Sequence, residues 1–241
     1  MGAGKQKEKE KRKRKKLAAK REKSKQEEDK EELGKIDYFI KLVFLNKMSD
    51  NTIMTGYLKV ILGCMFSGKT TELIKEYNRH KACDIRSCFV NHSADDRYGS
   101  GTSTTKTHSQ NSVTNDKSCK NLIDIIKEAK NYDAFFINEG QFFDDLYEAV
   151  NYLVNVENKK VYVCGLDGDF QRREFGSILK IIPLCDEVVK LKAICKFCKL
   201  NDGIFTCRLT NDTEQTVIGT DIYTALCRNC YNLRKNPEEN V

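Results

Sequence analysis

The fold is decided by the stretch Gly63-Cys64-Met65-Phe66-Ser67-Gly68-Lys69-Thr70, which fits the phosphate-binding loop pattern G-x-x-x-x-G-K-[ST]. Glycines let such a loop curl until successive backbone N–H groups face one anion, and the helix that follows adds the positive end of its dipole. We expect all eight residues to contact ATP, with Lys69 reaching the β- and γ-phosphates and the Thr70 hydroxyl binding Mg²⁺.

The residues on either side of this loop supply the context that the motif needs. Residues 57–62 are an apolar, β-branched run typical of a buried strand, and residues 71–77 carry apolar side chains at helical spacing. The alternative is a glycine-rich turn that only joins a strand to a helix. The order strand, loop, helix favours the phosphate site.

The positive charge of the chain is concentrated at its start. The 241 residues carry a net charge of +7, but residues 1–32 alone hold 14 Lys and Arg against 8 Asp and Glu. The remainder is nearly neutral, so we do not expect its folded part to bind nucleic acid. We interpret residues 1–53 as a charged, low-complexity extension that is disordered in part. We favour a solubilising role for the basic run 11–16. Nuclear import and RNA contact are the alternatives.

Cysteine usage and the first residues predict the compartment. Eleven cysteines, an odd number, occur without an early apolar signal segment, which favours a reducing, cytoplasmic location and no disulfide framework. The apolar stretch 36–45 is interrupted by charge and is shorter than the roughly 20 residues that cross a bilayer. We therefore expect no membrane segment.

Apolar segments alternate in type after the phosphate loop. Such alternation predicts an α/β fold of the phosphate-loop NTPase kind, with a mostly parallel sheet spanning residues 54–192. Ligands in these folds bind beyond the carboxyl ends of the strands. The predicted strands are 57–62, 86–91, 133–138, 160–166 and 187–191, the helices are 71–77, 122–129, 146–156 and 175–182, and a long loop covers 93–117.

Two C-x-x-C pairs predict a metal site. Cys195 and Cys198 are separated from Cys227 and Cys230 by 28 residues. In a reducing compartment such pairs favour a tetrahedral Zn²⁺ site, and four thiolates leave no open position for catalysis. The alternative is four unrelated buried cysteines. We expect a small zinc-ribbon subdomain at 193–241, with short strands at 204–209 and 215–219.

The other cysteines, including Cys64, Cys83 and Cys164, fit small core residues.

Glu139 is the candidate general base. It follows the predicted strand 133–138 directly, within Asn138-Glu139-Gly140-Gln141. An acid at such a strand end can deprotonate a hydroxyl acceptor. It can equally be a carboxylate that interacts with the dipole of the helix after it. The upstream phosphate loop favours the catalytic role.

Together these motifs resemble the cellular and poxviral-type thymidine kinases, a tetrameric, zinc-containing class. The likeness covers about residues 56–231 and rests on motifs in the same order. They are 62–73 around the phosphate loop, Asp95-x-Arg97-Tyr98, Glu139-Gly140-Gln141-Phe142-Phe143, Leu166-Asp167-Gly168-x-Phe170-Gln171-Arg172, Phe175-Gly176 and both cysteine pairs.

The resemblance implies transfer of the γ-phosphate of ATP to the 5′-hydroxyl of thymidine or deoxyuridine by a homotetramer. Glu139 matches the catalytic base, and Asp95, Arg97, Asn138 and Gln141 join the phosphate loop at the ATP and Mg²⁺ site. The segment 199–226 between the cysteine pairs matches a lasso over the nucleoside. The positions matching nucleoside contacts are Phe142, Leu166, Phe170, Phe175, Thr206, Gln215, Thr216, Val217, Ile218, Gly219 and Tyr223.

One departure from the family concerns position 138. The family usually has Asp where this chain has Asn138, which supplies no negative charge. One alternative function is therefore a catalytically weakened nucleotide-binding relative. Another is a phosphate-loop ATPase whose zinc ribbon acts on nucleic acid, although further helicase motifs are not found.

Overall fold

The computed structural model describes residues 55–93, 104–106, 112–217, 219 and 221–235. All of them belong to one compact unit, Met54–Val241, and residues 1–53 are not among the described residues. Among the helices described here, none has both the length and the apolar character needed to cross a membrane.

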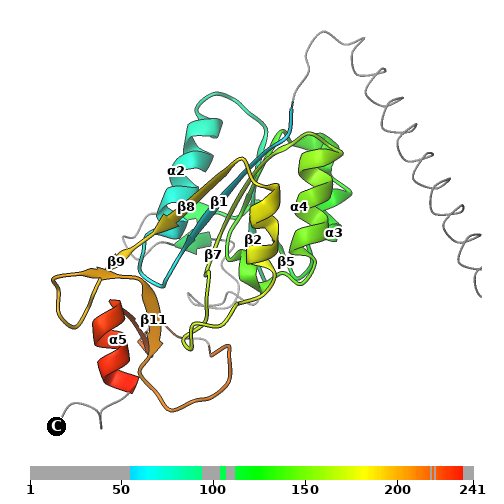
Figure 1. The fold of residues 1–241 in the computed structure, drawn as a ribbon. Coiled ribbons are helices and arrows are strands. Elements are labelled where there is room, and N and C mark those ends of the chain that lie inside the picture. The colour runs from blue at the N-terminus through cyan, green and yellow to red at the C-terminus, as the bar shows by residue number, and fades with distance from the viewer. Residues whose placement is uncertain (1–54, 94–103, 107–111, 218, 220, 236–241) are drawn as a thin grey trace, which may run out of the picture. The chain divides into compact units, whose positions relative to one another are not determined.

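A six-stranded, entirely parallel sheet forms the centre of the molecule (Figure 1). The predicted α/β class with a mostly parallel sheet is therefore confirmed. In sheet order the strands are β5 (Lys117–Cys119), β2 (Ser87–His92), β6 (Ala134–Ile137), β7 (Lys160–Gly165), β1 (Tyr57–Gly63) and β8 (Glu187–Leu191).

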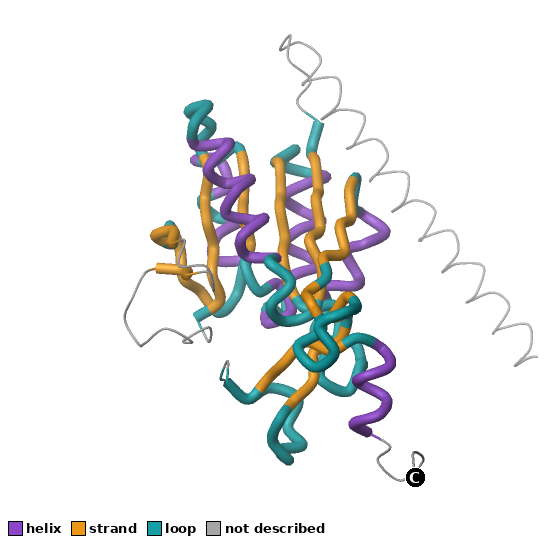
Figure 2. The backbone as a smooth tube through the Cα atoms, turned by 90° about the vertical axis from the view of Figure 1, so that its left-hand side faces the viewer, coloured by secondary structure: helices purple, strands orange, loops and turns teal. Residues whose placement is uncertain are grey.

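Helices cover both faces of this sheet, which explains why the central strands are apolar on both sides. Helix α2 (Lys69–Lys81) packs Leu73, Ile74 and Tyr77 on one face and lies in front of the strands in Figure 2. The opposite face carries α3 (Ile123–Ile126), α4 (Leu146–Asn155) and the 3₁₀ helix η3 (Ile178–Leu184). Every residue of β2 and β6 is buried.

Two regions differ from the elements expected from sequence. The predicted loop 93–117 contains a small hairpin, β3 (Thr104–Lys106) and β4 (Ser112–Thr114), and leads directly into β5. The predicted helix 122–129 is shorter, because α3 ends at Ile126 and a separate 3₁₀ turn, η1 (Ala129–Asn131), follows. Strands of three residues offer too few positions for apolar alternation to be recognised.

The chain after β8 folds into a small subdomain of short strands and one helix. It contains β9 (Ala193–Ile194), β10 (Asp202–Gly203), β11 (Phe205–Arg208), β12 (Tyr223–Leu226) and α5 (Arg228–Lys235). The predicted strand at 204–209 is confirmed as β11, but the predicted strand at 215–219 is wrong. β11 pairs instead with β12, and the described residues of 215–219 lie in the β11–β12 loop, residues 209–222.

The order of the strands in the sheet determines which chain segments lie together at its carboxyl edge. β7 lies between β1 and β6, so the segments that follow these three strands emerge side by side at the carboxyl edge of the sheet. They are the phosphate loop 63–68, the segment 138–141 and the loop 166–176. This edge is where ligands of such folds bind.

Candidate active site

The phosphate loop adopts the strained backbone that its glycines permit. A Cβ at Gly63, whose φ is 150°, would lie 2.5 Å from the carbonyl oxygen of Leu191 and 2.6 Å from Ser67 Oγ. Phe66 also has a positive φ of 64°, a conformation that costs a side-chain-bearing residue energy. Neighbouring structure thus holds the loop in a curl.

Lys69 and Ser67 converge on one carbonyl of the same loop. Lys69 Nζ donates to the Cys64 carbonyl at 2.8 Å, and Ser67 Oγ donates to it at 2.8 Å. Lys69 is buried at the first position of α2, so its charge is kept beside the helix N-terminus where phosphate groups bind. Burial raises the pKa of the Cys64 thiol, an effect that Lys69 partly offsets.

Asn138 links the end of β6 to the phosphate loop. Its Oδ1 accepts hydrogen bonds from Thr70 Oγ1 at 3.3 Å and from Cys164 Sγ at 3.1 Å, while Nδ2 donates to Asn91 Oδ1 at 2.9 Å. The Thr70 hydroxyl and the Asn138 carbonyl are hard oxygen donors that suit Mg²⁺. Both residues therefore offer the type of ligand atom that Mg²⁺ prefers, although the pair contributes no negative charge.

Glu139 is held by backbone strain and by a hydrogen-bonded neighbour. It is buried and left-handed, with φ 52° and ψ 47°. Such strain in a non-glycine residue often occurs at functional sites. Gln141 Nε2 donates to Glu139 Oε2 at 2.6 Å, and Gln141 Oε1 accepts from the Leu166 N–H at 3.0 Å. The side chain of Gln141 therefore connects the carboxylate to the loop 166–176.

Aromatic side chains gather next to Glu139. Phe142 and Phe175 meet edge to face with ring centroids 5.6 Å apart, and His92 lies 5.7 Å from Phe142. Gly176 allows this contact, because a Cβ there would lie 2.0 Å from the Gln141 carbonyl oxygen. The arrangement provides flat apolar surfaces close in the chain to Glu139, and such surfaces suit an aromatic ligand.

The two cysteine pairs meet as predicted. The Sγ atoms of Cys195, Cys198, Cys227 and Cys230 all lie within 4.8 Å of one another. Backbone N–H groups of Leu200 and Asn201 lower the pKa of Cys198, which favours the thiolate that binds metal. Four such sulfur ligands fit tetrahedral Zn²⁺.

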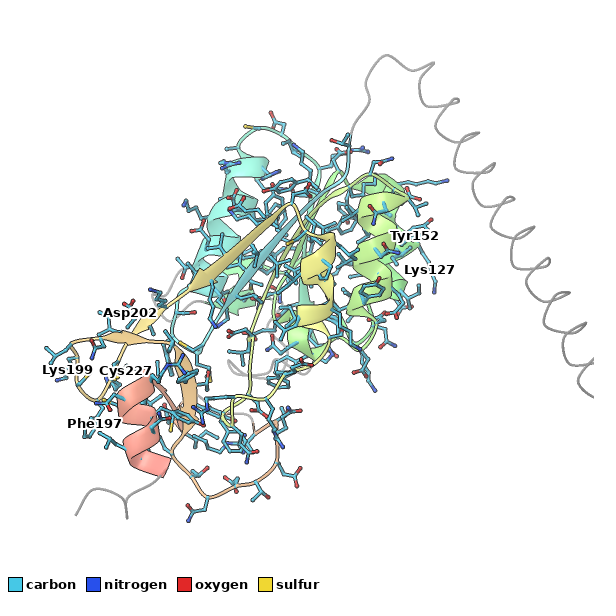
Figure 3. The ribbon with its side chains drawn as sticks, in the orientation of Figure 1. Lys127, Tyr152, Phe197, Lys199, Asp202 and Cys227 are labelled. Atoms are coloured by element: carbon cyan, nitrogen blue, oxygen red, sulfur yellow. The ribbon has the colours of Figure 1, made fainter. Side chains whose placement is uncertain are left out.

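Figure 3 shows how this centre is placed in the subdomain. Cys227 lies beside the start of α5, whereas Phe197 and Lys199 point outward from the subdomain. Among the remaining cysteines, Cys64 and Cys164 are buried as expected, but Cys83 is exposed, so the interpretation of Cys83 as a core residue is wrong. It follows the end of α2 in a turn at the surface.

The subdomain that follows β8 contacts the phosphate loop directly. Thr206 Oγ1 on β11 accepts a hydrogen bond from the Met65 N–H at 3.0 Å, and the Cys64 thiol donates to the Gly203 carbonyl at 3.1 Å. Cys64 also packs with Ala193 and Ala225. Movement of this subdomain would therefore disturb the loop on which phosphate is expected to bind.

Arg208 and Tyr223 organise the β11–β12 loop. The Arg208 guanidinium stacks on Phe170, with Cζ 3.7 Å from the ring centroid, and donates to Tyr223 Oη at 2.6 Å. Tyr223 in turn donates to the Val217 carbonyl at 3.0 Å. Arg208 also donates to the carbonyls of Asp212, Glu214 and Gln215.

The Asp169 carboxylate fixes the course of the loop 166–176 through hydrogen bonds from the Gln171 and Arg173 N–H groups. Burial alone would raise its pKa, but hydrogen bonds from the Arg173 backbone, the Gln215 side chain and the Arg173 side chain outweigh burial and lower the pKa. The carboxylate therefore stays ionised at neutral pH. Gln215 of the β11–β12 loop donates to this carboxylate, at 3.0 Å from Nε2 to Oδ2.

Most residues expected from sequence lie at this edge, and three fall outside the described part. Asp95, Arg97 and Ile218 are not among the described residues, so their predicted roles stay predictions. Thr216 is exposed, and Gly219 has a positive φ of 152° in the β11–β12 loop. Gln141 lies between Glu139 and Leu166, and its predicted contact with ATP stays a prediction.

Three residues of this site were not predicted from the sequence. Asn91 ends the predicted strand 86–91, so its position at a strand terminus was a usable signal. Arg208 is a charged residue inside the predicted strand 204–209, and a buried charge implies partners. Asp169 occupies the unassigned position of the motif at 166–172, and nothing local distinguishes it from Asp167.

Comparison with known proteins agrees with this geometry. The thymidine kinase family model matches residues 56–231. The thymidine kinases of monkeypox virus and vaccinia virus (strain Western Reserve) are both 40% identical to this chain, and that of variola virus is 39% identical. In each case the alignment spans 177 residues, which is 73% of this chain and 97% of the viral protein. This chain belongs to the thymidine kinase family.

Proposed function

We propose that this protein is an ATP-dependent thymidine kinase that transfers the γ-phosphate of ATP to the 5′-hydroxyl of thymidine or deoxyuridine. The observation that carries the proposal is the position of Glu139. It is buried directly after β6, which β7 separates from β1 and its phosphate loop in the sheet, and it precedes Phe142 of the aromatic pair by three residues, in a chain of the thymidine kinase family.

Each part of the site has a task in this reaction. The phosphate loop amides and Lys69 bind and neutralise the phosphates, which is the main requirement of phosphoryl transfer. Glu139 accepts the proton of the 5′-hydroxyl as that oxygen bonds to the γ-phosphorus and the bond to the β-phosphate oxygen breaks. Gln141 keeps the carboxylate oriented through its bond to Oε2.

Two groups are held by the protein in this proposal. Thr70 and Asn138 would hold Mg²⁺, which neutralises charge on the β- and γ-phosphates when bound. The four cysteines would hold a structural Zn²⁺ that fixes both ends of the lasso.

The decisive experiment is a phosphorylation assay of the purified protein. Transfer of labelled γ-phosphate from ATP to thymidine, with the product identified as the 5′-monophosphate, is the expected result. A folded, zinc-containing protein that phosphorylates no pyrimidine deoxynucleoside would reject the proposal. Single-stranded nucleic acid that stimulates ATP hydrolysis without such a product would favour the nucleic-acid ATPase instead.

We expect the Asn138→Asp variant to use Mg²⁺ at lower concentration than the parent. An added carboxylate attracts the ion more strongly, and about 1 kcal/mol of attraction lowers the half-saturating Mg²⁺ concentration roughly fivefold. The amide of Asn91, 2.9 Å away, can rotate to donate to the new carboxylate. Titrating activity with Mg²⁺ measures the effect.

The matched control for this variant is Asn155→Asp, the same chemical change at the exposed end of α4. Equal half-saturation for the parent and Asn138→Asp would contradict a metal role for position 138. A relative that is catalytically weakened by Asn138 would instead gain maximal rate in the Asp variant.

We also propose the homotetramer that the family resemblance implies and the cytoplasmic location predicted from cysteine usage and the first residues. Light scattering of the full chain in zinc-containing buffer should give four times the mass of one chain, which is 27.7 kDa. A monomer would contradict the assembly. Imaging the full chain beside a chain that starts at Met54 tests whether the basic extension directs the protein to the nucleus.

A further inference from the structure

We propose that Asp169, Arg208 and Gln215 form a clasp that positions the β11–β12 loop at the nucleoside pocket, with Gln215 as its releasable part. The clasp rests on the proposed function, since it assigns these residues to capture of the nucleoside. They are positioning residues: the role given to each is to hold the loop through its hydrogen bonds, whereas Glu139 performs the chemistry.

Arg208 is the fixed part of the clasp. It is 5% exposed at the end of β11, paired with Tyr223 of β12. Its Nη1 donates to the Asp212 carbonyl at 2.9 Å and to the Glu214 carbonyl, and its Nη2 donates to the Gln215 carbonyl at 3.1 Å. A planar guanidinium has rigid donors, so one side chain fixes the course of the loop backbone.

Gln215 joins this loop to a different part of the site. Its Nε2 donates to Asp169 Oδ2 at 3.0 Å and to the Glu174 carbonyl at 3.2 Å. Both acceptors lie in the loop 166–176, which also carries Phe170 beneath Arg208. The Gln215 side chain thus attaches the β11–β12 loop to the loop 166–176, and the Arg208–Phe170 stack attaches the end of β11 to it.

Asp169 is built to receive this contact. Its side chain has 0% exposure, Oδ1 accepts the N–H groups of Gln171 and Arg173 at 2.8 and 2.9 Å, and Oδ2 accepts Arg173 Nε at 2.8 Å. These bonds hold the carboxylate in place, so Gln215 meets an acceptor that is already oriented. A hydrogen bond to a charged acceptor is stronger than a neutral one.

Arg208 is buried and Gln215 is exposed, so we assign the opening of the clasp to the Gln215 hydrogen bonds. Arg208 lies in a strand next to the zinc centre and cannot leave without disrupting the β11–β12 pairing. Gln215 is exposed near the middle of the loop, with exposed residues before it. A nucleoside can therefore enter when the Gln215 bonds break, and the apparent affinity depends on the fraction of molecules in which the clasp closes again.

The test is the Gln215→Ala variant of the full, zinc-loaded chain. We expect the KM for thymidine to rise about three- to tenfold, the effect of losing one or two hydrogen bonds that favour the closed loop. The kcat and the KM for ATP should stay within about twofold, because saturating thymidine holds the loop closed. The matched control is Thr213→Ala, an exposed residue of the same loop.

The Asp169→Asn variant tests the acceptor of the Gln215 hydrogen bond. It should also raise the KM for thymidine, and adding Gln215→Ala to it should have less than its full effect, because the bond between the two residues is already lost and only the Gln215 bond to the Glu174 carbonyl remains. Independent, multiplicative effects of the two substitutions would overturn the clasp.

A readout without substrate separates this inference from the proposed function. Proteinase K should cut the β11–β12 loop faster in Gln215→Ala than in the parent or Thr213→Ala, with zinc content and melting temperature unchanged. If the parent does not phosphorylate thymidine, the proposed function fails while this comparison still tests the clasp. Equal cleavage rates, or a parallel loss of zinc and kcat in Gln215→Ala, would overturn it.

Discussion

The Glu139→Gln variant is expected to lose between about a hundred- and ten-thousandfold in kcat, the usual contribution of a positioned general base. Glutamine has the same shape and can still accept the hydrogen bond from Gln141, but it cannot take the proton of the 5′-hydroxyl. The KM for thymidine should change little, because the aromatic contacts of the pocket remain. Initial rates at saturating ATP and thymidine measure the loss.

The control for this variant is Glu148→Gln, an exposed glutamate on α4. It should retain the parent rate, and thermal unfolding should give similar midpoints for all three proteins. A Glu139→Gln variant with the parent kcat would show that Glu139 is only a carboxylate near a helix start. The catalytic assignment would then be withdrawn, whatever the fate of the phosphate loop.

The Cys198→Ser variant is expected to lose zinc and at least about a hundredfold in kcat/KM for thymidine. Structural zinc sites contribute on the order of 10 kcal/mol to the folding of small domains, so the loss of one ligand exposes the ribbon to unfolding. Thr206 on β11, which accepts from the phosphate loop, and Tyr223 on β12 would then lose their fixed positions. Metal analysis, thermal unfolding and kinetics measure the effect together.

Cys83→Ser is the matched control for the zinc prediction. Cys83 is exposed and lies outside the four-cysteine cluster, so its replacement should leave zinc content and rate unchanged. A zinc-free Cys198→Ser protein with parent kinetics would contradict the view that zinc supports the nucleoside pocket. Parent zinc content in that variant would contradict the four-thiolate site itself.

The short motifs were predictable because their chemistry is local. Residues 63–70 carry the glycines and the lysine of a phosphate loop within eight positions, and each cysteine pair has the spacing of a metal knuckle. The parallel sheet was predictable because strands buried on both faces are continuously apolar. Elements with three residues lack such a pattern, and the exposed residues Gln215 and Thr216 were wrongly assigned to a strand.

The fold class, the phosphate loop, the two cysteine pairs and the position of Glu139 at a strand end were therefore predictable from the sequence alone. Only the tertiary structure decided which distant residues meet. It places Asn91 beside Asn138, and it joins Gln215 to Asp169 across 46 positions of the chain. Such contacts depend on the order of strands in the sheet and on the path of an exposed loop. Neither of these can be predicted from the spacing of residues within a short motif.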